Sequence, residues 1–266
     1  MNFKKDSIFS KSDKIKAEKQ LHSGVLAVWG SPASGKTVVA TKIAKYLSDK
    51  KKNVVLLLCD MTCPMLPCIC PPSDLENDRS LGSILAAPHV NEALVKYHMV
   101  THKKNEYLTV LGLQKGENEY TYTPFSDIQA KELIASLRKI APYVVIDCSS
   151  YIANDILSAV SLLESDYILR LANCDLKSVS YLSSQLPILK NAGLDFDKQY
   201  KCLSNIKSNQ GVAQIDTGMG NFTFKLPYSA EVEQQYLEGN LLSELNLKSS
   251  KAFRKEIEKT VREVFG

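Results

Sequence analysis

The chain of 266 residues has no long hydrophobic run and little excess charge of either sign. No apolar stretch approaches the length of a membrane-spanning helix, and no apolar segment of a signal peptide follows Met1. A net charge of +4 is too small to require a nucleic-acid partner. Hydrophobic residues make up 44% and charged residues 23%, as is ordinary for soluble globular proteins. We therefore expect a cytoplasmic protein.

The seven cysteines lack the spacing of a metal site. Four of them, Cys59, Cys63, Cys68 and Cys70, lie in one segment and are separated by three, four and one residues. Zinc and iron–sulfur sites commonly use paired Cys-x-x-Cys ligands, which this spacing does not provide. We expect reduced thiols of a cytosolic protein, with no assigned role.

The segment Gly30–Thr37 fits the pattern Gly-x-x-x-x-Gly-Lys-Thr of a phosphate-binding P-loop. A buried strand is predicted before it and an amphipathic helix after it, which is the context that the motif requires. Backbone N–H groups of such a loop and the positive end of the helix dipole surround a phosphate chain. The predicted nucleotide-binding residues here are Gly30, Ser31, Pro32, Ala33, Ser34, Gly35, Lys36, Thr37 and Val38.

Beyond residue 23, apolar runs alternate with helical patterns, as in repeated βαβ units. We predict an α/β fold with a mostly parallel twisted sheet and helices on both faces, in a single P-loop NTPase domain over residues 23–266. Residues 1–22 are polar and lysine-rich and are predicted to form a flexible basic arm. The predicted strands are 25–29, 53–59, 107–113, 143–147, 167–171, 199–205 and 222–226. The predicted helices are 38–47, 80–87, 91–100, 126–140, 152–164, 176–192, 231–237 and 250–265, with loops over 61–78 and 208–221.

Two acids follow predicted buried strands and complete the expected site. Asp60 follows residues 53–59, and Asp147 ends the strand 143–147. In a parallel sheet both strand ends lie at the edge that carries the P-loop. Lys36 is expected to reach the outer phosphates, and Thr37 with Asp147 to hold Mg²⁺. The predicted catalytic residues are Lys36, Asp60 and Asp147.

The order of these segments resembles that of the ParA/MinD-type ATPases, a SIMIBI class of P-loop proteins, from about residue 24 to 242. In that family the acid corresponding to Asp60 helps to position or activate water. The resemblance implies that Asn205, in Ser204–Lys207, contacts adenine, and that Pro227 and Tyr228 lie beside the base. It further implies ATP/ADP and Mg²⁺ as cofactors and a homodimer. Within the family the chain looks most like the TadZ/CpaE pilus-assembly branch.

The sequence also departs from the family pattern. Family members usually carry Lys-Gly-Gly in the P-loop, and that lysine reaches the nucleotide of the partner subunit; here the residues are Ser31, Pro32 and Ala33. The second strand of family members usually ends in Asp-x-Asp; here Leu58 replaces the first acid and Asp60 matches the second. Strand 143–147 resembles the Walker B strand, but the glycine that usually follows its acid, here Asp147, is missing. A missing cation near the transferred phosphoryl group removes transition-state stabilisation. We expect nucleotide binding with slow or partner-dependent hydrolysis.

Three functions are compatible with these sequence features. One is an ATPase switch for dimerisation or positioning, serving a pilus, secretion or partition machine through an unidentified protein partner. Another is a nucleotide-binding scaffold without turnover. The third is a small-molecule kinase, which would need lid arginines, and only Arg79 and Arg138 fall in suitable regions. They are given in order of preference. The sequence determines neither whether the nucleotide is ATP or GTP nor which protein is the partner.

The last predicted helix, 250–265, is amphipathic, with Phe253, Ile257, Val261, Val264 and Phe265 on one stripe. MinD-like proteins use such a helix as a membrane anchor, which would place the protein at the inner face of the membrane. Its lysines also allow non-specific DNA contact. We favour a helix packed on the sheet over either role.

Overall fold

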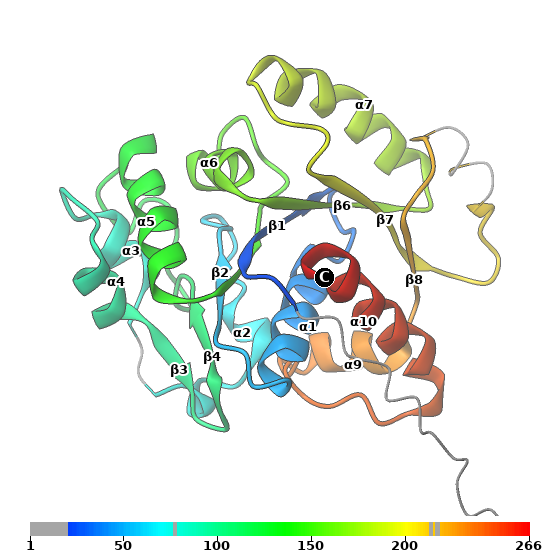
Figure 1. Ribbon diagram of the computed structural model, residues 1–266, viewed down its shortest axis with the longest axis horizontal. Coiled ribbons are helices and arrows are strands. Elements are labelled where there is room, and N and C mark those ends of the chain that lie inside the picture. Colours follow the sequence, from blue (N-terminus) through cyan, green and yellow to red (C-terminus); the bar gives the residue numbers. More distant parts are fainter. Residues whose placement is uncertain (1–20, 77–78, 213–214, 216–218) are drawn as a thin grey trace, which may run out of the picture.

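The computed structural model describes residues 21–76, 79–212, 215 and 219–266. Within them an eight-stranded sheet has the order β3-β4-β2-β5-β1-β6-β7-β8 (Figure 1). Its strands are β1 (Gly24–Gly30), β2 (Val54–Leu58), β3 (Val100–His102), β4 (Asn105–Leu111), β5 (Tyr143–Asp147), β6 (Tyr167–Asn173), β7 (Gln199–Ile206) and β8 (Phe224–Pro227). All neighbours pair in parallel except β3 and β4, which pair antiparallel. The predicted mostly parallel sheet is confirmed.

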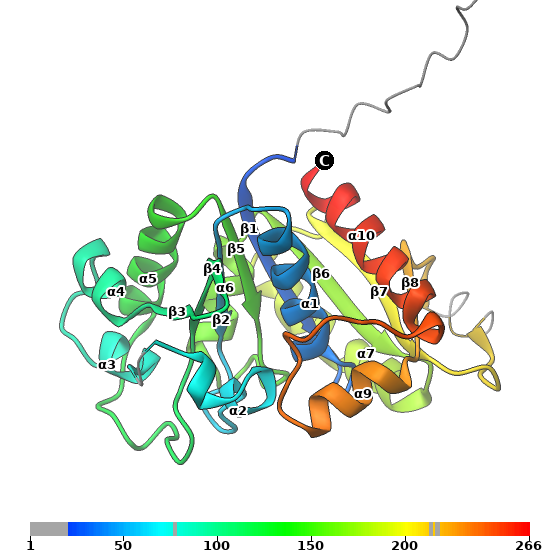
Figure 2. The same cartoon turned by 90° about the horizontal axis from the view of Figure 1, so that it is seen from below.

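Helices cover both faces of this sheet (Figures 1 and 2). Side chains of β1 alternate between two cores, with Ala27 and Trp29 on one face and Leu26 and Val28 on the other. The two cores are sealed by helices α1 (Lys36–Asp49), α2 (Leu66–Ile69), α3 (Leu81–Leu85), α4 (Glu92–His98), α5 (Asp127–Ile140), α6 (Ile156–Glu164), α7 (Leu176–Asn191), α9 (Ala230–Leu237) and α10 (Lys251–Phe265). Two short 3₁₀ turns, Pro72–Asp74 and Lys248–Ser250, join them. The layered architecture predicted from βαβ alternation is therefore present.

Several helices start where a side chain caps the first turn. Ser126 and Gln129 form a reciprocal capping box at α5. The Asp155 carboxylate accepts from the Ser158 N–H, so α6 begins at Ile156 rather than at the predicted residue 152. These caps satisfy N–H groups that have no partner within the helix.

Two short elements differ from the sequence-based prediction. The helix predicted over 91–100 ends at His98, and Val100–His102 instead forms the edge strand β3, antiparallel to β4. β-Branched Val100 and Thr101 suit a strand, and pairing with β4 outweighs the helical spacing. The loop predicted over 61–78 contains α2, a single turn with proline in its first turn, where proline is tolerated.

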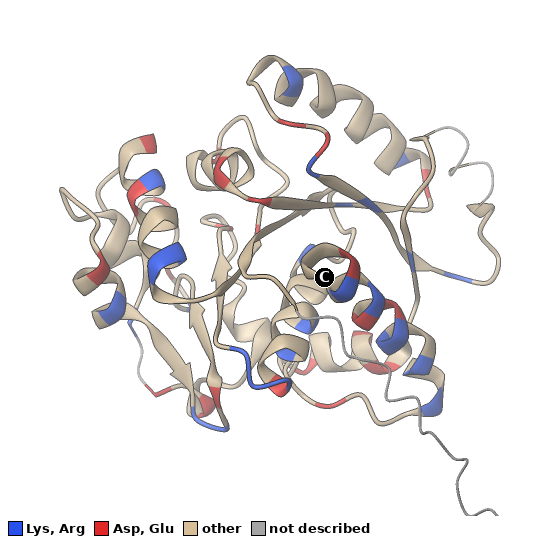
Figure 3. Ribbon diagram, viewed as in Figure 1, with Lys and Arg blue, Asp and Glu red and all other residues tan. Residues whose placement is uncertain are grey.

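The C-terminal helix α10 packs its apolar stripe on the sheet. Phe253, Ile257, Val261, Val264 and Phe265 are all buried, and the Phe265 ring meets Tyr143 and Tyr167 edge-on at 5.4 and 5.7 Å. Basic and acidic residues are interspersed along the rest of this helix (Figure 3). The preferred prediction for this helix is thus confirmed. Among the described residues, no helix is both long enough and apolar enough to cross a bilayer.

Two predicted segments fall largely or partly outside the described residues. The arm over 1–22 is described only at Leu21 and His22, where the Leu21 carbonyl accepts from the Tyr143 hydroxyl at 3.0 Å. The His22 N–H donates to the Phe265 carbonyl at 2.5 Å. Of the loop predicted over 208–221, residues 213–214 and 216–218 are likewise outside.

Candidate nucleotide site

The P-loop leaves the sheet at its centre, because β1 lies between β5 and β6. A Cβ atom added at Gly30 would lie 2.1 Å from the Leu171 carbonyl oxygen of β6. Only glycine allows the chain to turn so close to its neighbouring strand. The loop therefore starts at the carboxyl edge of the sheet, where ligands bind in open α/β folds.

The loop itself adopts an unusual backbone conformation. Ala33 and Gly35 have positive φ angles of 60° and 77°. Two side chains from neighbouring strands fix the loop: Ser204 Oγ donates to the Ser34 carbonyl at 2.6 Å, and Asn173 Nδ2 donates to the Ala33 carbonyl at 3.1 Å. The left-handed backbone conformation is disfavoured for alanine, so the two hydrogen bonds stabilise a conformation of Ala33 that is otherwise unfavourable. Helix α1 then begins at Lys36, with its N-terminus at the loop.

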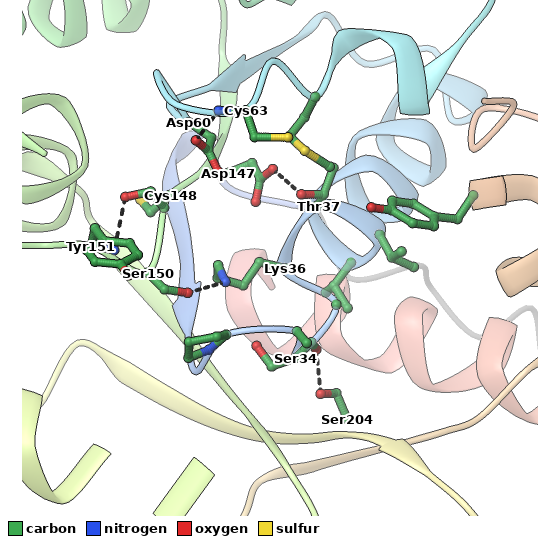
Figure 4. A pocket seen from close by; sticks show the side chains of 18 of the residues that line it. Ser34, Lys36, Thr37, Asp60, Cys63, Asp147, Cys148, Ser150, Tyr151 and Ser204 are labelled. Atoms are coloured by element: carbon green, nitrogen blue, oxygen red, sulfur yellow. Dashed lines mark hydrogen bonds between the residues drawn. The ribbon is translucent and has the colours of Figure 1, made fainter. Parts of the chain in front are cut away.

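Lys36 lies folded against the loop and the strand β5 end (Figure 4). Its Nζ donates to Ser150 Oγ at 2.6 Å and to the Ser31 carbonyl at 3.3 Å. Burial lowers the pKa of Lys36, and the negative charge of Asp147 partly opposes that shift. The ammonium group is thus desolvated and suited to an anionic ligand.

Thr37 and Asp147 form the second contact of the site. Thr37 Oγ1 donates to Asp147 Oδ2 at 2.6 Å. The Asp147 side chain is only 3% exposed, and its Oδ1 has no hydrogen-bond partner among the described residues. Burial raises the pKa of Asp147 to about 7, although the Thr37 hydrogen bond and Lys36 lower it. A hydroxyl beside an unpaired carboxylate oxygen is a donor set that fits Mg²⁺.

Asp60 lies in the same cavity, just beyond β2. Its Oδ1 accepts from the Thr62 and Cys63 N–H groups at 3.0 and 2.8 Å, so one oxygen stabilises the turn. The negative charge of Asp60 acts to raise the pKa of both Lys36 and Asp147. The structure therefore brings together the three predicted catalytic residues, which are far apart in the sequence.

These groups line a cavity of about 1010 Å³. Of the predicted binding residues, Pro32, Ala33, Ser34, Gly35, Lys36, Thr37, Val38, Asn205, Pro227 and Tyr228 line it together with Asp60 and Asp147. Gly30 and Ser31 do not. Ser31 is fully buried, and its Oγ lies 2.7 Å from Ser178 Oγ of α7. The position at which the resemblance implies a cross-subunit lysine thus holds a side chain directed into the protein.

Another part of the cavity is lined by Asn205, Pro227 and Tyr228. Asn205 has a positive φ angle of 55° at the end of β7. The Tyr228 hydroxyl donates to Glu233 Oε2 at 2.6 Å, and Lys207 Nζ lies 5.2 Å from the centre of the Tyr228 ring. This part of the cavity offers the aromatic face of Tyr228.

Several residues at the site are not indicated by the sequence motifs. They are Ser150, Ser178, Tyr181 and Ser204, which bond the P-loop residues or one another, and Glu233 and Tyr236, which line the cavity. Only Ser204 and Ser150 lie beside a segment that the sequence singles out. A serine or tyrosine in a helix carries no motif, so its place at the site follows only from the packing.

Other candidate groups lie elsewhere or form no cluster. Within the described ranges, no group of three or more His, Cys, Asp or Glu side chains has metal-binding geometry. All seven cysteines are free thiols, and five of them are buried. Arg138 pairs with Asp166 at 2.6 Å, at the edge of the sheet opposite to the P-loop, and Arg79 donates to the Tyr97 carbonyl. Neither arginine lines the cavity, which removes the basis for a kinase lid.

The architecture matches solved structures of ParA, MinD and plasmid partition proteins. A ParA family ATPase of Chlorobium tepidum TLS superposes with a TM-score of 0.74 at 14% identity, covering 90% of this chain and 98% of that one. MinD of Pyrococcus horikoshii OT3, complexed with Mg-ADP, gives 0.71 at 17% identity over 89% and 95%. A putative plasmid partition protein of Borrelia burgdorferi B31, bound to AMPPNP, gives 0.70 at 16% identity over 91% and 98%.

No protein-family model and no curated protein sequence matches the chain significantly. The likeness to the solved structures shows that the chain has the fold of the MinD and ParA ATPases, which confirms the predicted fold class. A shared fold does not by itself establish an activity.

Proposed function

We propose that this chain, which has the fold of the MinD and ParA ATPases, binds ATP and ADP with Mg²⁺ and acts as a nucleotide-dependent switch. The observation that carries the proposal is the group of Lys36, Thr37 and Asp147 at the N-terminus of α1. There a desolvated ammonium, a hydroxyl and an unpaired carboxylate oxygen face one cavity. The helix N-terminus and the ammonium bind the phosphates, and Thr37 with Asp147 would hold Mg²⁺.

Hydrolysis would proceed by in-line attack of water on the γ-phosphorus. The bond to the β,γ-bridging oxygen breaks, and ADP and inorganic phosphate leave. When bound, Mg²⁺ neutralises charge on the phosphate oxygens. Asp60, whose Oδ1 holds the turn in place, is the residue that would orient the water. Asn205, Pro227 and Tyr228 line the part of the cavity assigned to the base.

Slow turnover is part of the proposal. Ser31 is buried and bonded to Ser178, so this position supplies no cation to either its own or a partner's phosphates. Removing one charge-stabilising group from a phosphoryl-transfer site costs several kcal/mol of barrier, or about 10²–10³ in rate. The same observation supports the alternative of a nucleotide-binding scaffold without turnover.

We further propose a homodimer that docks through the carboxyl edge of the sheet and positions a larger assembly, such as a pilus, secretion or partition machine. Supporting it are exposed apolar side chains at the cavity mouth: Tyr151 is 75% exposed, and Ile156 and Tyr236 are 43% and 38% exposed. Large exposed apolar groups gathered at one place often mark an interface. The TadZ/CpaE pilus branch is the most specific form of this proposal. Its setting would be the cytoplasm or the inner face of the membrane.

The test of nucleotide binding is calorimetric titration of ATP·Mg²⁺ into the purified chain. We expect saturable binding that Lys36→Ala abolishes or weakens at least tenfold. Lys45→Ala is the matched control, because Lys45 lies on the same helix but pairs with Asp49 and Glu244 outside the cavity. Absence of saturable heat, or equal binding by Lys36→Ala, would refute the site.

A single-turnover assay separates the switch from the scaffold. The protein, in molar excess over radiolabelled ATP, is mixed with ATP and Mg²⁺, and the release of labelled phosphate is followed over time. Slow release that Asp60→Ala abolishes supports the ATPase, since Asp60 is placed to orient water. Binding without any release supports the scaffold.

A further inference from the structure

Lys36, the residue expected to bind the outer phosphates, already has a close acceptor in the structure. Its Nζ lies 2.6 Å from Ser150 Oγ and 3.3 Å from the Ser31 carbonyl oxygen. We infer that Ser150 is a positioning residue: its hydroxyl oxygen accepts a hydrogen bond from Lys36 Nζ until an outer phosphate oxygen takes its place. We also infer that Tyr181 of α7 holds Ser150 in that position. The inference rests on the proposed function and adds regulation to the same site.

The direction of the hydrogen bonds makes Ser150 an acceptor. A serine hydroxyl has one proton, and Ser150 Oγ donates it to the Gly30 carbonyl at 3.0 Å. A lone pair of Ser150 therefore faces the Lys36 ammonium. Two backbone segments are thereby joined, the start of the P-loop and the loop after β5. The sequence gives no sign of this contact, since 114 positions separate the two residues.

A phosphate oxygen competes with this hydroxyl for the same ammonium. The charged acceptor forms the stronger hydrogen bond, so the exchange favours bound nucleotide. The bond to Ser150 is nevertheless lost in the exchange, and its strength is subtracted from the net affinity. Ser150 thus lowers nucleotide affinity, while its hydroxyl keeps the buried ammonium paired before a nucleotide binds.

Tyr181 fixes the backbone of Ser150. The Tyr181 hydroxyl donates to the Ser150 carbonyl at 2.5 Å, and its ring lies 6.1 Å from the ring of Trp29. Trp29 directly precedes the P-loop and is fully buried. One turn earlier in α7, Ser178 contacts Ser31 of the P-loop at 2.7 Å. Helix α7 is therefore bonded to both sides of the phosphate site, so a shift of Ser150 on nucleotide binding is transmitted to it.

The test compares the dissociation constant for ATP·Mg²⁺ of the full chain and its variants by calorimetry. We expect Ser150→Ala to bind about three- to tenfold more tightly, because no hydroxyl then has to be displaced from Lys36 Nζ. Ser150→Thr retains the hydroxyl and should restore the wild-type constant. Tyr181→Phe should tighten binding by less, and combining it with Ser150→Ala should add nothing, since both act through one contact.

Ser184→Ala is the matched control. Its exposed hydroxyl lies on the same helix as Tyr181, donates to the Ser180 carbonyl at 3.0 Å and does not line the cavity, so the dissociation constant of this variant should equal that of the wild type. Unchanged or weaker binding by Ser150→Ala overturns the inference, as does tighter binding by Ser150→Thr. If Ser150→Ala does not fold, Tyr181→Phe decides, and unchanged binding by it also overturns the inference. A wild-type chain that does not bind ATP refutes the proposed function itself, which distinguishes the two failures.

Discussion

Asp147 is a buried carboxyl group whose ionisation the protein opposes. Its pKa is about 7 in the folded chain against 3.8 as the ordinary value, chiefly because of burial. Between these pH values the unfolded chain releases the proton while the folded chain keeps it. Stability of the nucleotide-free protein therefore falls as pH rises from about 4 to about 7. Below pH 7 the protonated group is also a poor ligand, so affinity for Mg²⁺ should decrease with falling pH.

The variant Asp147→Asn tests this ionisation. Asparagine has the same shape and still accepts from Thr37, but it carries no charge at any pH. We expect it to unfold at the same denaturant concentration as wild type near pH 4. At pH 8 it should be more stable than wild type by roughly 2–4 kcal/mol, because the pKa of the Asp147 carboxyl is about 7 in the folded chain against an ordinary 3.8. Urea denaturation of both proteins over pH 4–8, without nucleotide, gives the comparison, and parallel pH profiles would contradict it.

Single residues differ in how far the sequence reveals their place in the structure. The placement of Lys36, Thr37 and Asp147 at one cavity is predictable, because the P-loop pattern and the strand-end acid fix it through local backbone geometry. Ser31 is also found, but its direction is not: its partner Ser178 is 147 positions away, and a serine hydroxyl fits many environments. The contacts of Ser150 are hidden for the same reason. What the sequence misses at this site is the pairing of small polar groups, which the packing of α7 decides.

The elements show the same division between strong and weak local signals. Strands β1 and β5 are nearly continuous apolar runs and lie where the sequence predicts them. The edge strand β3 has three residues, too few to display alternation, and it exists because β4 is there to pair with it. The single turn α2 is concealed by its proline and cysteine content. Short elements depend on tertiary contacts that no window of sequence contains.

Helix α10 provides a prediction at the scale of an element. Phe265 is 1% exposed and packs against Tyr143 and Tyr167, so Phe265→Ala leaves a cavity where the helix meets the sheet. We expect a loss of about 3–5 kcal/mol in the free energy of unfolding, measured by urea denaturation. The stripe is occupied by the protein core, and the cost follows directly from that burial.

Arg262→Ala is the control on the same helix. Arg262 is 54% exposed and pairs with Glu258 at 2.6 Å on the outer face. Exposed ion pairs contribute little, so its loss should change stability by less than about 0.5–1 kcal/mol. Similar losses for the two variants would mean that the apolar stripe is not the contact that secures α10, and the packing argument would be wrong.

At the scale of the whole molecule, the carboxyl edge of the sheet combines the proposed phosphate site with exposed apolar groups. Tyr151, which is 75% exposed, directly follows Ser150 in the loop after β5 and is one of the residues that line the cavity (Figure 4). A net charge of +4 does not keep two copies apart over long distances at physiological salt. If the proposed switch dimerises through this edge, the bound nucleotide and the exposed side chains beside the cavity are buried in the same interface. Dimerisation would then depend on nucleotide binding.

This linkage predicts an ATP-dependent dimer that a charge at the mouth disrupts. With a non-hydrolysable ATP analogue and Mg²⁺, light scattering after size exclusion should show the molecular mass doubling, whereas the nucleotide-free chain remains a monomer. Tyr151→Glu should stay monomeric while binding the analogue within about threefold of wild type, because burying an unpaired carboxylate costs several kcal/mol. Leu163→Glu, which adds the same charge at an exposed residue near the far end of α6, should dimerise like wild type. The prediction is contradicted if Tyr151→Glu still dimerises, or if neither Tyr151→Glu nor Leu163→Glu does. In either case the charge at Tyr151 has no effect of its own, and the interface lies elsewhere.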